Sequence, residues 1–191
     1  RQMCIRDRHT NVLITAKCNQ TIYTDAGAIV YGQIFCGMGS NFTIAGHGVL
    51  CGSIYDRYAD TIVPVSITNA HDFTIRDITI LDPSAWTVNL YKCKNAVIDN
   101  VKIIGARSNS DGITMQNVEN VLVQNCFVRS WDDNLVLKGY NGNVDGVTCR
   151  NCILWTDLAQ SCEIGYETRA QFIRNITFED ITVPVSYTHL T

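Results

Sequence analysis

The sequence lacks any window of ten or more residues with the periodicity of an amphipathic helix, which argues against a fold built on packed helices. It also lacks an apolar run near the roughly 18 residues of a membrane-spanning helix, and no signal peptide is visible. Charged residues are scarce, at 17% of 191, and the net charge of −3 argues against nucleic acid as a partner. With 46% hydrophobic residues, the chain suits one domain with a sizeable core.

The two ends of the chain differ from the rest. Residues 1–8 and 185–191 fit none of the repeats described below. They resemble the translated sequencing-adapter scars that recur at the ends of metagenomic gene fragments, so we expect them to be non-native. Residues 9–184 are then a partial domain, cut at both ends. Without residues 1–8, which hold three Arg and one Asp, the net charge changes from −3 to −5.

A repeat of short strand-like segments runs from about residue 65. Five units begin 23, 25, 22 and 27 residues apart, at Val65, Val88, Ile113, Leu135 and Cys162. Each unit holds two or three segments in which apolar and polar residues alternate and Val, Ile and Thr dominate. Corner positions carry residues that tolerate a left-handed backbone, namely Asn69, Asp77, Asn95, Asn100, Asn120, Asn125, Asn151, Asn175 and Asp180.

Three strands per unit predict an all-β fold, a single-stranded parallel β-helix in which each strand pairs with its equivalent in the next coil. A sandwich or barrel also has many short strands, but neither requires the corners to keep their phase through five units. Cys126, Cys149, Cys152 and Cys162 lie in or beside strands, so we expect buried, stacked thiols. We interpret Cys149 and Cys152 as strand positions flanking a corner rather than a zinc or redox motif, because no second C-x-x-C accompanies them.

Three carboxylates form the strongest functional signal. Asp111 lies two residues before Ile113, and Asp133, preceded by Asp132, lies two residues before Leu135. On successive coils these carboxylates would stack on one edge, about 4.8 Å apart. Such crowding raises some carboxyl pKa values and makes acid–base chemistry possible.

The run from Asn109 to Ile113, Asn-Ser-Asp-Gly-Ile, followed by Asp132-Asp133, resembles the catalytic signature of the polygalacturonase family, glycoside hydrolase family 28. It also resembles the related dextranase and isopullulanase family. In these enzymes an Asn-Thr-Asp-Gly motif precedes an Asp-Asp pair by one coil, and here Asp111 and Asp132 are 21 residues apart. Residues 42–52 resemble the glycine-rich opening of the same folds.

This resemblance covers roughly residues 40–183. It implies a right-handed, pectin lyase-like β-helix that hydrolyses a polysaccharide with no cofactor and no metal. The implied protein is a monomer that binds neither membrane nor nucleic acid, and it is secreted or periplasmic and degrades cell-wall polysaccharide. If the chain is cut at its start, the lost segment could have carried the signal peptide, so the absence of one here means little.

The signature departs from the polygalacturonase pattern at several points. Trp131 and Asn134 flank the Asp pair where that family has Gly and Cys, and together with Lys138 they look closer to the dextranase-like branch. The Gly-His-Gly expected one coil after the pair is absent, and the Arg-x-Lys substrate clamp would follow residue 183. The favoured substrate is a pectin-type galacturonan or rhamnogalacturonan, with a neutral α-glucan as the alternative.

By resemblance, Asp132 is the general acid, and Asp111 and Asp133 hold and deprotonate the attacking water of an inverting hydrolase. Two ionised neighbours would help to keep Asp132 protonated, and the three titrations should be coupled. Inverting carboxyl groups typically lie about 6.5–9.5 Å apart, wider than one coil of about 4.8 Å. Separation alone favours retention of configuration, and we follow the resemblance to inversion.

Seven other residues are candidates for substrate contact. Lys138 leaves the strand that follows the Asp pair, and Glu163 and Tyr166 lie one coil later. Gln160 and Trp86 lie two residues before a strand, as Asp111 and Asp133 do. The full set is Asn109, Lys138, Gln160, Glu163, Tyr166, Trp86 and Trp131. The two Trp could stack on sugar rings or cap the edge of the β-helix.

Other interpretations of the carboxylates remain open. They could be turn residues, a calcium site, or part of a lyase in which Arg129 or Arg107 is the base. His47, between two glycines, and His71, at a corner, are interpreted as structural and solvated. A non-catalytic glycan-binding or adhesin β-helix is the alternative from another class of protein. Because like charges stacked this closely destabilise a sheet, we favour the enzyme.

Overall fold

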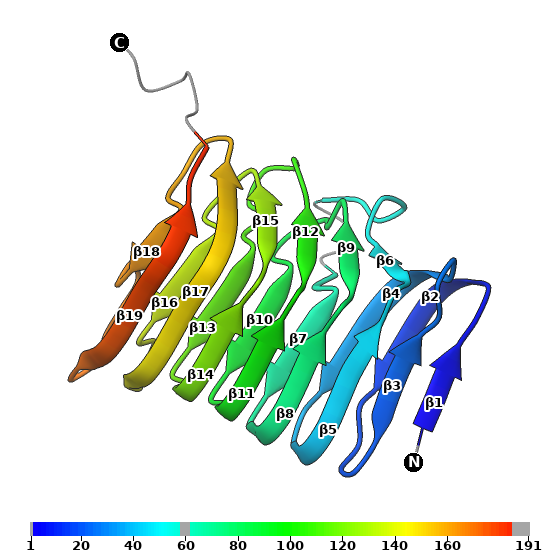
Figure 1. Ribbon diagram of the computed structural model, residues 1–191, viewed down its shortest axis with the longest axis horizontal. Coiled ribbons are helices and arrows are strands. Elements are labelled where there is room, and N and C mark those ends of the chain that lie inside the picture. Colours follow the sequence, from blue (N-terminus) through cyan, green and yellow to red (C-terminus); the bar gives the residue numbers. More distant parts are fainter. Residues whose placement is uncertain (1, 58–61, 185–191) are drawn as a thin grey trace.

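The computed structural model describes residues 2–57 and 62–184 and shows the predicted parallel β-helix (Figure 1). Every regular element in these ranges is a strand, and the described part of the chain has no helix that could cross a membrane. The strands are β1 (Gln2–Ile5), β2 (Arg8–Thr15), β3 (Thr21–Thr24), β4 (Ile29–Cys36), β5 (Gly39–Gly46), β6 (Val49–Cys51), β7 (Val65–Thr68), β8 (Ala70–Arg76), β9 (Thr79–Leu81), β10 (Val88–Tyr91), β11 (Lys94–Asp99), β12 (Lys102–Ile104), β13 (Ile113–Gln116), β14 (Glu119–Gln124), β15 (Phe127–Ser130), β16 (Leu135–Lys138), β17 (Val144–Thr156), β18 (Cys162–Ile164) and β19 (Ile173–Thr182).

Strands of successive coils pair in parallel and form three faces. The first face stacks β7, β10, β13, β16 and β18, and the second stacks β8, β11, β14, β17 and β19. The third stacks β9, β12, β15 and the second half of β17. The five predicted unit starts are confirmed, because they form one continuous register of Val65, Val88, Ile113, Leu135 and Cys162.

The Asn and Asp corners turn the chain from one face to the next. All nine predicted corner residues have positive φ, between 50° and 64°. Side chains at these corners also bond between coils. Asn125 Nδ2 donates to Asp99 Oδ1 at 2.7 Å, and Asn151 Nδ2 donates to Asn125 Oδ1 at 2.7 Å. The corners therefore set the backbone bend and satisfy their own polar groups on the surface.

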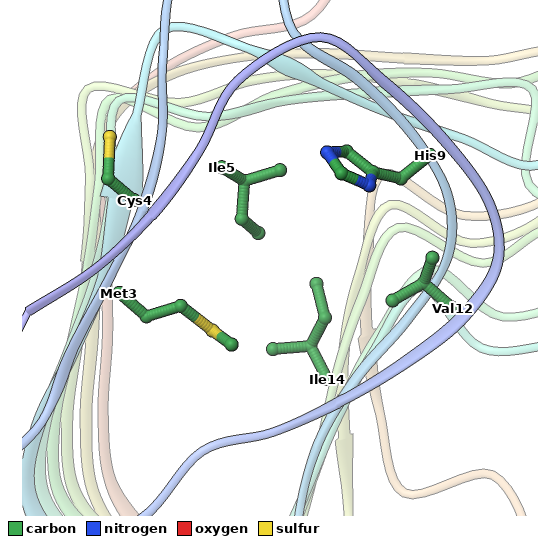
Figure 2. A pocket seen from close by; sticks show the side chains of 6 residues that line it. All are labelled: Met3, Cys4, Ile5, His9, Val12 and Ile14. Carbon is green, nitrogen blue, oxygen red and sulfur yellow. The ribbon is translucent and has the colours of Figure 1, made fainter.

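The core is the column of inward-facing aliphatic side chains that the alternation predicted. Cys126, Cys149 and Cys152 are buried in it, Cys162 is partly buried, and all nine cysteines are free thiols. Ile153 pairs with Phe127, so Cys126 and Cys152 follow one another in the stack. At the N-terminal end, inward side chains line a cavity of about 190 Å³ (Figure 2).

One expectation about the N-terminal segment is wrong. Residues 1–8 were expected to fit no coil, but β1 pairs in parallel with β3, from Gln2 opposite Thr21 to Ile5 opposite Thr24. The pairing uses main-chain groups, which any sequence supplies, and Ile5 is the one buried side chain of this strand. The other expected foreign segment, 185–191, lies outside the described residues.

Candidate active site

Two turns at one edge of the first face carry the three carboxylates. The turn from β12 to β13 holds Asp111, and the turn from β15 to β16 holds Asp132 and Asp133. The inter-coil ladder continues through these turns, because Gly112 N donates to Asp133 O at 2.8 Å and Asn134 N donates to Gln160 O at 2.9 Å. Asp111 and Asp133 are therefore equivalent positions on adjacent coils, as the sequence pattern predicted.

The same register extends the column by one coil in each direction. Trp86 lies two residues before Val88, which pairs with Ile113, and Gln160 lies two residues before Cys162, which pairs with Leu135. The column is thus Trp86, Asp111, Asp133 and Gln160. The predicted phase of Trp86 and Gln160 with the carboxylates is confirmed.

Asp111 is the most enclosed of the three carboxylates, with 4% of its surface exposed. Burial, followed by the charge of Asp132, raises its pKa from 3.8 to about 7, and the charge of Lys138 limits this rise. Burial also raises the pKa of Asp133, while a hydrogen bond from the Gln160 main chain opposes that shift. The cluster therefore retains a proton at a pH at which isolated carboxyl groups have lost theirs.

One hydrogen bond within the β15–β16 turn and one from the next coil orient the Asp pair. Asp133 N donates to Asp132 Oδ1 at 3.0 Å, and Gln160 N donates to Asp133 Oδ1 at 2.8 Å. Each bond leaves the second carboxylate oxygen of its Asp for another partner. Both side chains are half-buried, so the pair borders the solvent while Asp111 lies deeper.

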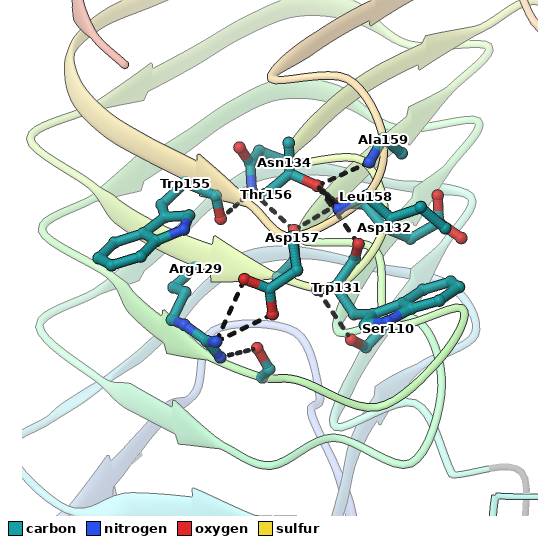
Figure 3. A network of polar contacts seen from close by, with 12 residues as sticks. Ser110, Arg129, Trp131, Asp132, Asn134, Trp155, Thr156, Asp157, Leu158 and Ala159 are labelled. Carbon is teal, nitrogen blue, oxygen red and sulfur yellow. Dashed lines mark hydrogen bonds and ion pairs between the residues drawn. The ribbon is translucent and has the colours of Figure 1, made fainter. Parts of the chain in front are cut away.

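A polar network beneath this turn holds its shape (Figure 3). Asn134 is fully buried, and its Nδ2 donates to Ser130 Oγ at 2.6 Å and to Trp155 O at 3.1 Å. Ser130 Oγ donates to Asp132 O at 2.7 Å, and Thr156 Oγ1 donates to the same oxygen at 2.8 Å. The main chain of Asp132 is thus fixed from two coils.

Sequence reasoning missed these supporting residues. Asn134 was noted for departing from the family pattern, but its burial was not foreseen. One feature of the sequence could have indicated its burial: Asn134 lies directly before the apolar run Leu135–Leu137. A polar residue there must find partners inside the fold, because an unpaired buried amide is costly.

The β12–β13 turn depends on a glycine. A Cβ at Gly112 would collide with the carbonyl oxygen of Asn134 and with Val128 Cγ1. Ser110, before Asp111, is fully buried, and its Oγ accepts from Trp131 N at 3.4 Å. Gly112 is therefore needed for the close approach of adjacent coils. The interpretation of Asp111 and Gly112 as a simple turn accounts for the glycine, but it does not account for the burial of Asp111.

Lys138 is enclosed by one acidic side chain and two aromatic rings. It is 4% exposed, and its Nζ lies 3.2 Å from Glu167 Oε2. The same Nζ lies 4.8 Å from the centre of the Trp86 ring and 5.9 Å from that of Tyr166. Since Trp86 precedes Asp111 in the column and Lys138 leaves the coil of Asp133, this contact joins the coils on either side of Asp111.

The remaining predicted contacts border this cluster. Glu163 lies on β18, and its charge contributes to the raised pKa of Asp133. Tyr166 is exposed, and its N–H donates to Glu163 Oε1 at 3.0 Å. Asn109 is exposed in the β12–β13 turn with φ of 60°, and Trp131 is half-buried before the Asp pair.

The lyase and calcium interpretations gain no support from the described residues. Arg107 donates to the carbonyl oxygens of Gly52, Tyr55 and Asp82 at 2.6–2.7 Å. Arg129 forms a two-pronged ion pair with Asp157, so both guanidinium groups are engaged in holding turns. Within residues 2–57 and 62–184, no three His, Cys, Asp or Glu side chains gather as metal ligands would.

Comparison with known proteins agrees with this geometry. The model of glycosyl hydrolases family 28 matches residues 60–186, which is about two thirds of the chain. The chain belongs to this family. An exopolygalacturonase from Oenothera organensis is 28% identical over 129 residues, covering 65% of this chain and 35% of that protein. An isopullulanase from Aspergillus niger is 27% identical over 186 residues, covering 85% of this chain and 31% of that protein.

Solved structures show the same family fold. The exopolygalacturonase of Thermotoga maritima superposes with a TM-score of 0.80 at 14% identity, over 94% of this chain and 58% of that one. A structure from Parabacteroides merdae gives 0.63 at 17% identity, over 96% and 80%. This family 28 chain spans about a third of the length of the curated relatives that it matches.

Proposed function

We propose that this chain is the catalytic part of an inverting glycoside hydrolase that cleaves a polysaccharide with Asp111, Asp132 and Asp133. The observation that carries the proposal is the convergence of three carboxyl groups on equivalent turns of adjacent coils, one of them almost fully buried. Stacked like charges destabilise a sheet, so a purely structural β-helix has no use for them. Membership of family 28 supports the same reaction class.

In the proposed reaction Asp132 protonates the glycosidic oxygen, and Asp111 and Asp133 bind and deprotonate the attacking water. Below about pH 7 the cluster holds a proton, which burial favours on Asp111 in the free chain. The reactive form carries this proton on Asp132, so it has the same proton count as the resting form. Activity should therefore decline as pH rises above about 7, where this proton is lost.

For the substrate, we propose a pectin-type galacturonan or rhamnogalacturonan, since two exopolygalacturonases are among the relatives. A neutral α-glucan is the second candidate, favoured by the isopullulanase that matches 85% of the chain. Residues that border the carboxylates are the proposed sugar contacts: Trp86, Asn109, Trp131, Gln160, Glu163 and Tyr166. We further propose residues 9–184 as the native domain of a secreted or periplasmic protein.

The test is release of reducing ends from polygalacturonate, a rhamnogalacturonan, dextran and pullulan, with Asp132→Asn beside the wild type. Activity on one substrate that disappears in the variant supports the reaction and the acid. A folded protein that cleaves none of them, while still binding one, would instead support the glycan-binding alternative. Proton NMR of the first product anomer tests inversion, and a product with the configuration of the substrate refutes it.

A further inference from the structure

Several charged groups shift the pKa values of Asp111 and Asp133. Lys138 is the cation among them, and its positive charge lowers both pKa values. The sequence suggested that it binds substrate. Its surroundings favour another role, because its ammonium is enclosed by protein. Only 4% of the residue is exposed, and Glu167 Oε2, the Trp86 ring and the Tyr166 ring all lie within 6 Å of Nζ.

The charged groups in and beside the carboxylate cluster come from five segments. Asp111 lies in the β12–β13 turn, Asp132 and Asp133 lie in the β15–β16 turn, and Glu163 lies on β18. Glu167 follows β18 and pairs directly with Lys138. Near the β12–β13 turn there is also Arg57, whose Nε donates to Ser108 O at 2.7 Å. The lysine thus has one direct acidic partner, Glu167, and its charge also acts on Asp111 and Asp133. A buried cation in such a setting is held by its partners.

The contact between Lys138 and Trp86 joins the coils on either side of Asp111. Lys138 starts on the coil of Asp133, and its Nζ lies 4.8 Å from the centre of the Trp86 ring, which belongs to the coil before Asp111. Asp111 lies between these two coils and is itself almost fully buried. A long lysine stem commonly packs along neighbouring side chains while its charged end meets its partners.

We propose that Lys138 is a positioning residue that acts on Asp111 and Asp133 from within the protein and sets how many protons they carry, instead of binding charge on the substrate. The consequence for catalysis rests on the proposed function, but the electrostatic role does not. An opposite charge close to a carboxyl group ordinarily changes its pKa by about 1–3 units. Lys138 therefore offsets part of the effect of burial on Asp111, and it lowers the pH at which Asp111 loses its proton.

The direct test is an NMR titration of carboxyl carbons in protein labelled with ¹³C at Asp Cγ, with signals assigned by Asp→Asn variants. We expect Lys138→Met to raise the titration midpoint of Asp111 by about one unit or more, and Lys138→Arg to restore it nearly to the wild-type value. Lys92→Met is the matched control. Lys92 is also a lysine over an aromatic ring, 5.1 Å from the centre of Tyr91, but it is exposed and should leave the midpoint unchanged.

Glu167→Gln provides a test with the opposite sign. Glu167 is an exposed residue whose side chain is 54% accessible, so the variant should fold even if Lys138→Met does not. Removing this negative charge leaves Lys138 with fewer acidic partners, and the midpoint of Asp111 should decrease. An unchanged midpoint in Glu167→Gln, or equal midpoints in Lys138→Met and the wild type, overturns the proposal.

Activity measurements separate this proposal from the proposed function. If Lys138 acts through the carboxyl groups, the pH profile of kcat/KM moves upward in Lys138→Met and downward in Glu167→Gln. If it binds substrate charge, KM for polygalacturonate rises in Lys138→Met while the profile stays in place, which refutes the positioning role. Shifted NMR midpoints in a protein that cleaves no glycan would refute the proposed function and leave the role of Lys138 standing.

Discussion

The burial of Asp111 predicts an unusual dependence of stability on pH, and Asp111→Asn is the change that tests it. The pKa of Asp111 is about 7 in the folded chain, against an ordinary value of 3.8. The folded state therefore binds more protons than the unfolded state between these two values. Since stability falls with pH wherever the folded state binds more protons, the free energy of unfolding should decrease between about pH 4 and pH 7.

The magnitude follows from the size of the shift. About three pKa units correspond to about 4 kcal/mol, at 1.36 kcal/mol per unit. This stabilisation is fully present below the unfolded pKa and lost as pH rises through the folded pKa. Asparagine has the shape of aspartate but no charge, so Asp111→Asn should be more stable than the wild type at pH 8, by up to about 4 kcal/mol. At pH 4 the two proteins should unfold almost equally.

The assay is urea unfolding followed by tryptophan fluorescence at half-unit steps from pH 5 to pH 8. The window avoids the exposed carboxyl groups with lowered pKa values, such as Asp72 and Asp145, because they lose their protons well below pH 5. The difference in unfolding free energy between variant and wild type is the quantity to plot. Parallel curves across the whole window would refute the reasoning, since they would mean that Asp111 is ionised in the folded chain at pH 5.

Three more predictions concern the two turns. Asp132→Asn should reduce glycan hydrolysis by roughly 10²–10⁴-fold and leave the urea midpoint within error of the wild type; a small loss measured by reducing-end assay would reassign the acid. Gly112→Ala should destabilise the chain by about 1–3 kcal/mol, because the added methyl meets Asn134 O and Val128, and an unchanged thermal midpoint would contradict the close approach. Asn134→Ala leaves Ser130 Oγ without its donor, so it should lower the free energy of unfolding by about 1–3 kcal/mol and reduce kcat more than it changes KM. Unaltered kinetics would mean that the Asp pair keeps its geometry without the network.

Much of the fold could be predicted because β-helix signals are local and repeated. The strand starts at Val65, Val88 and Ile113 pair as expected, since alternation with period two tells which side chains face inward. The positions of the Asn corners could also be predicted, because the tendency to adopt a left-handed backbone is a property of single residues. The pairing of β1 with β3 was not predicted, because it uses main-chain hydrogen bonds and the side chains of β1 show no repeat pattern.

The equivalence of Asp111 and Asp133 on adjacent coils could be read from residue order alone, because each lies two residues before a strand and those strands pair. The burial of one carboxyl group and the charge of the cluster became evident from the three-dimensional structure. Those properties depend on the charges of Asp132 and Lys138, which act on Asp111 from the next coil. Register follows from neighbours along the chain, whereas burial and pKa depend on side chains that lie a full coil or more away in sequence.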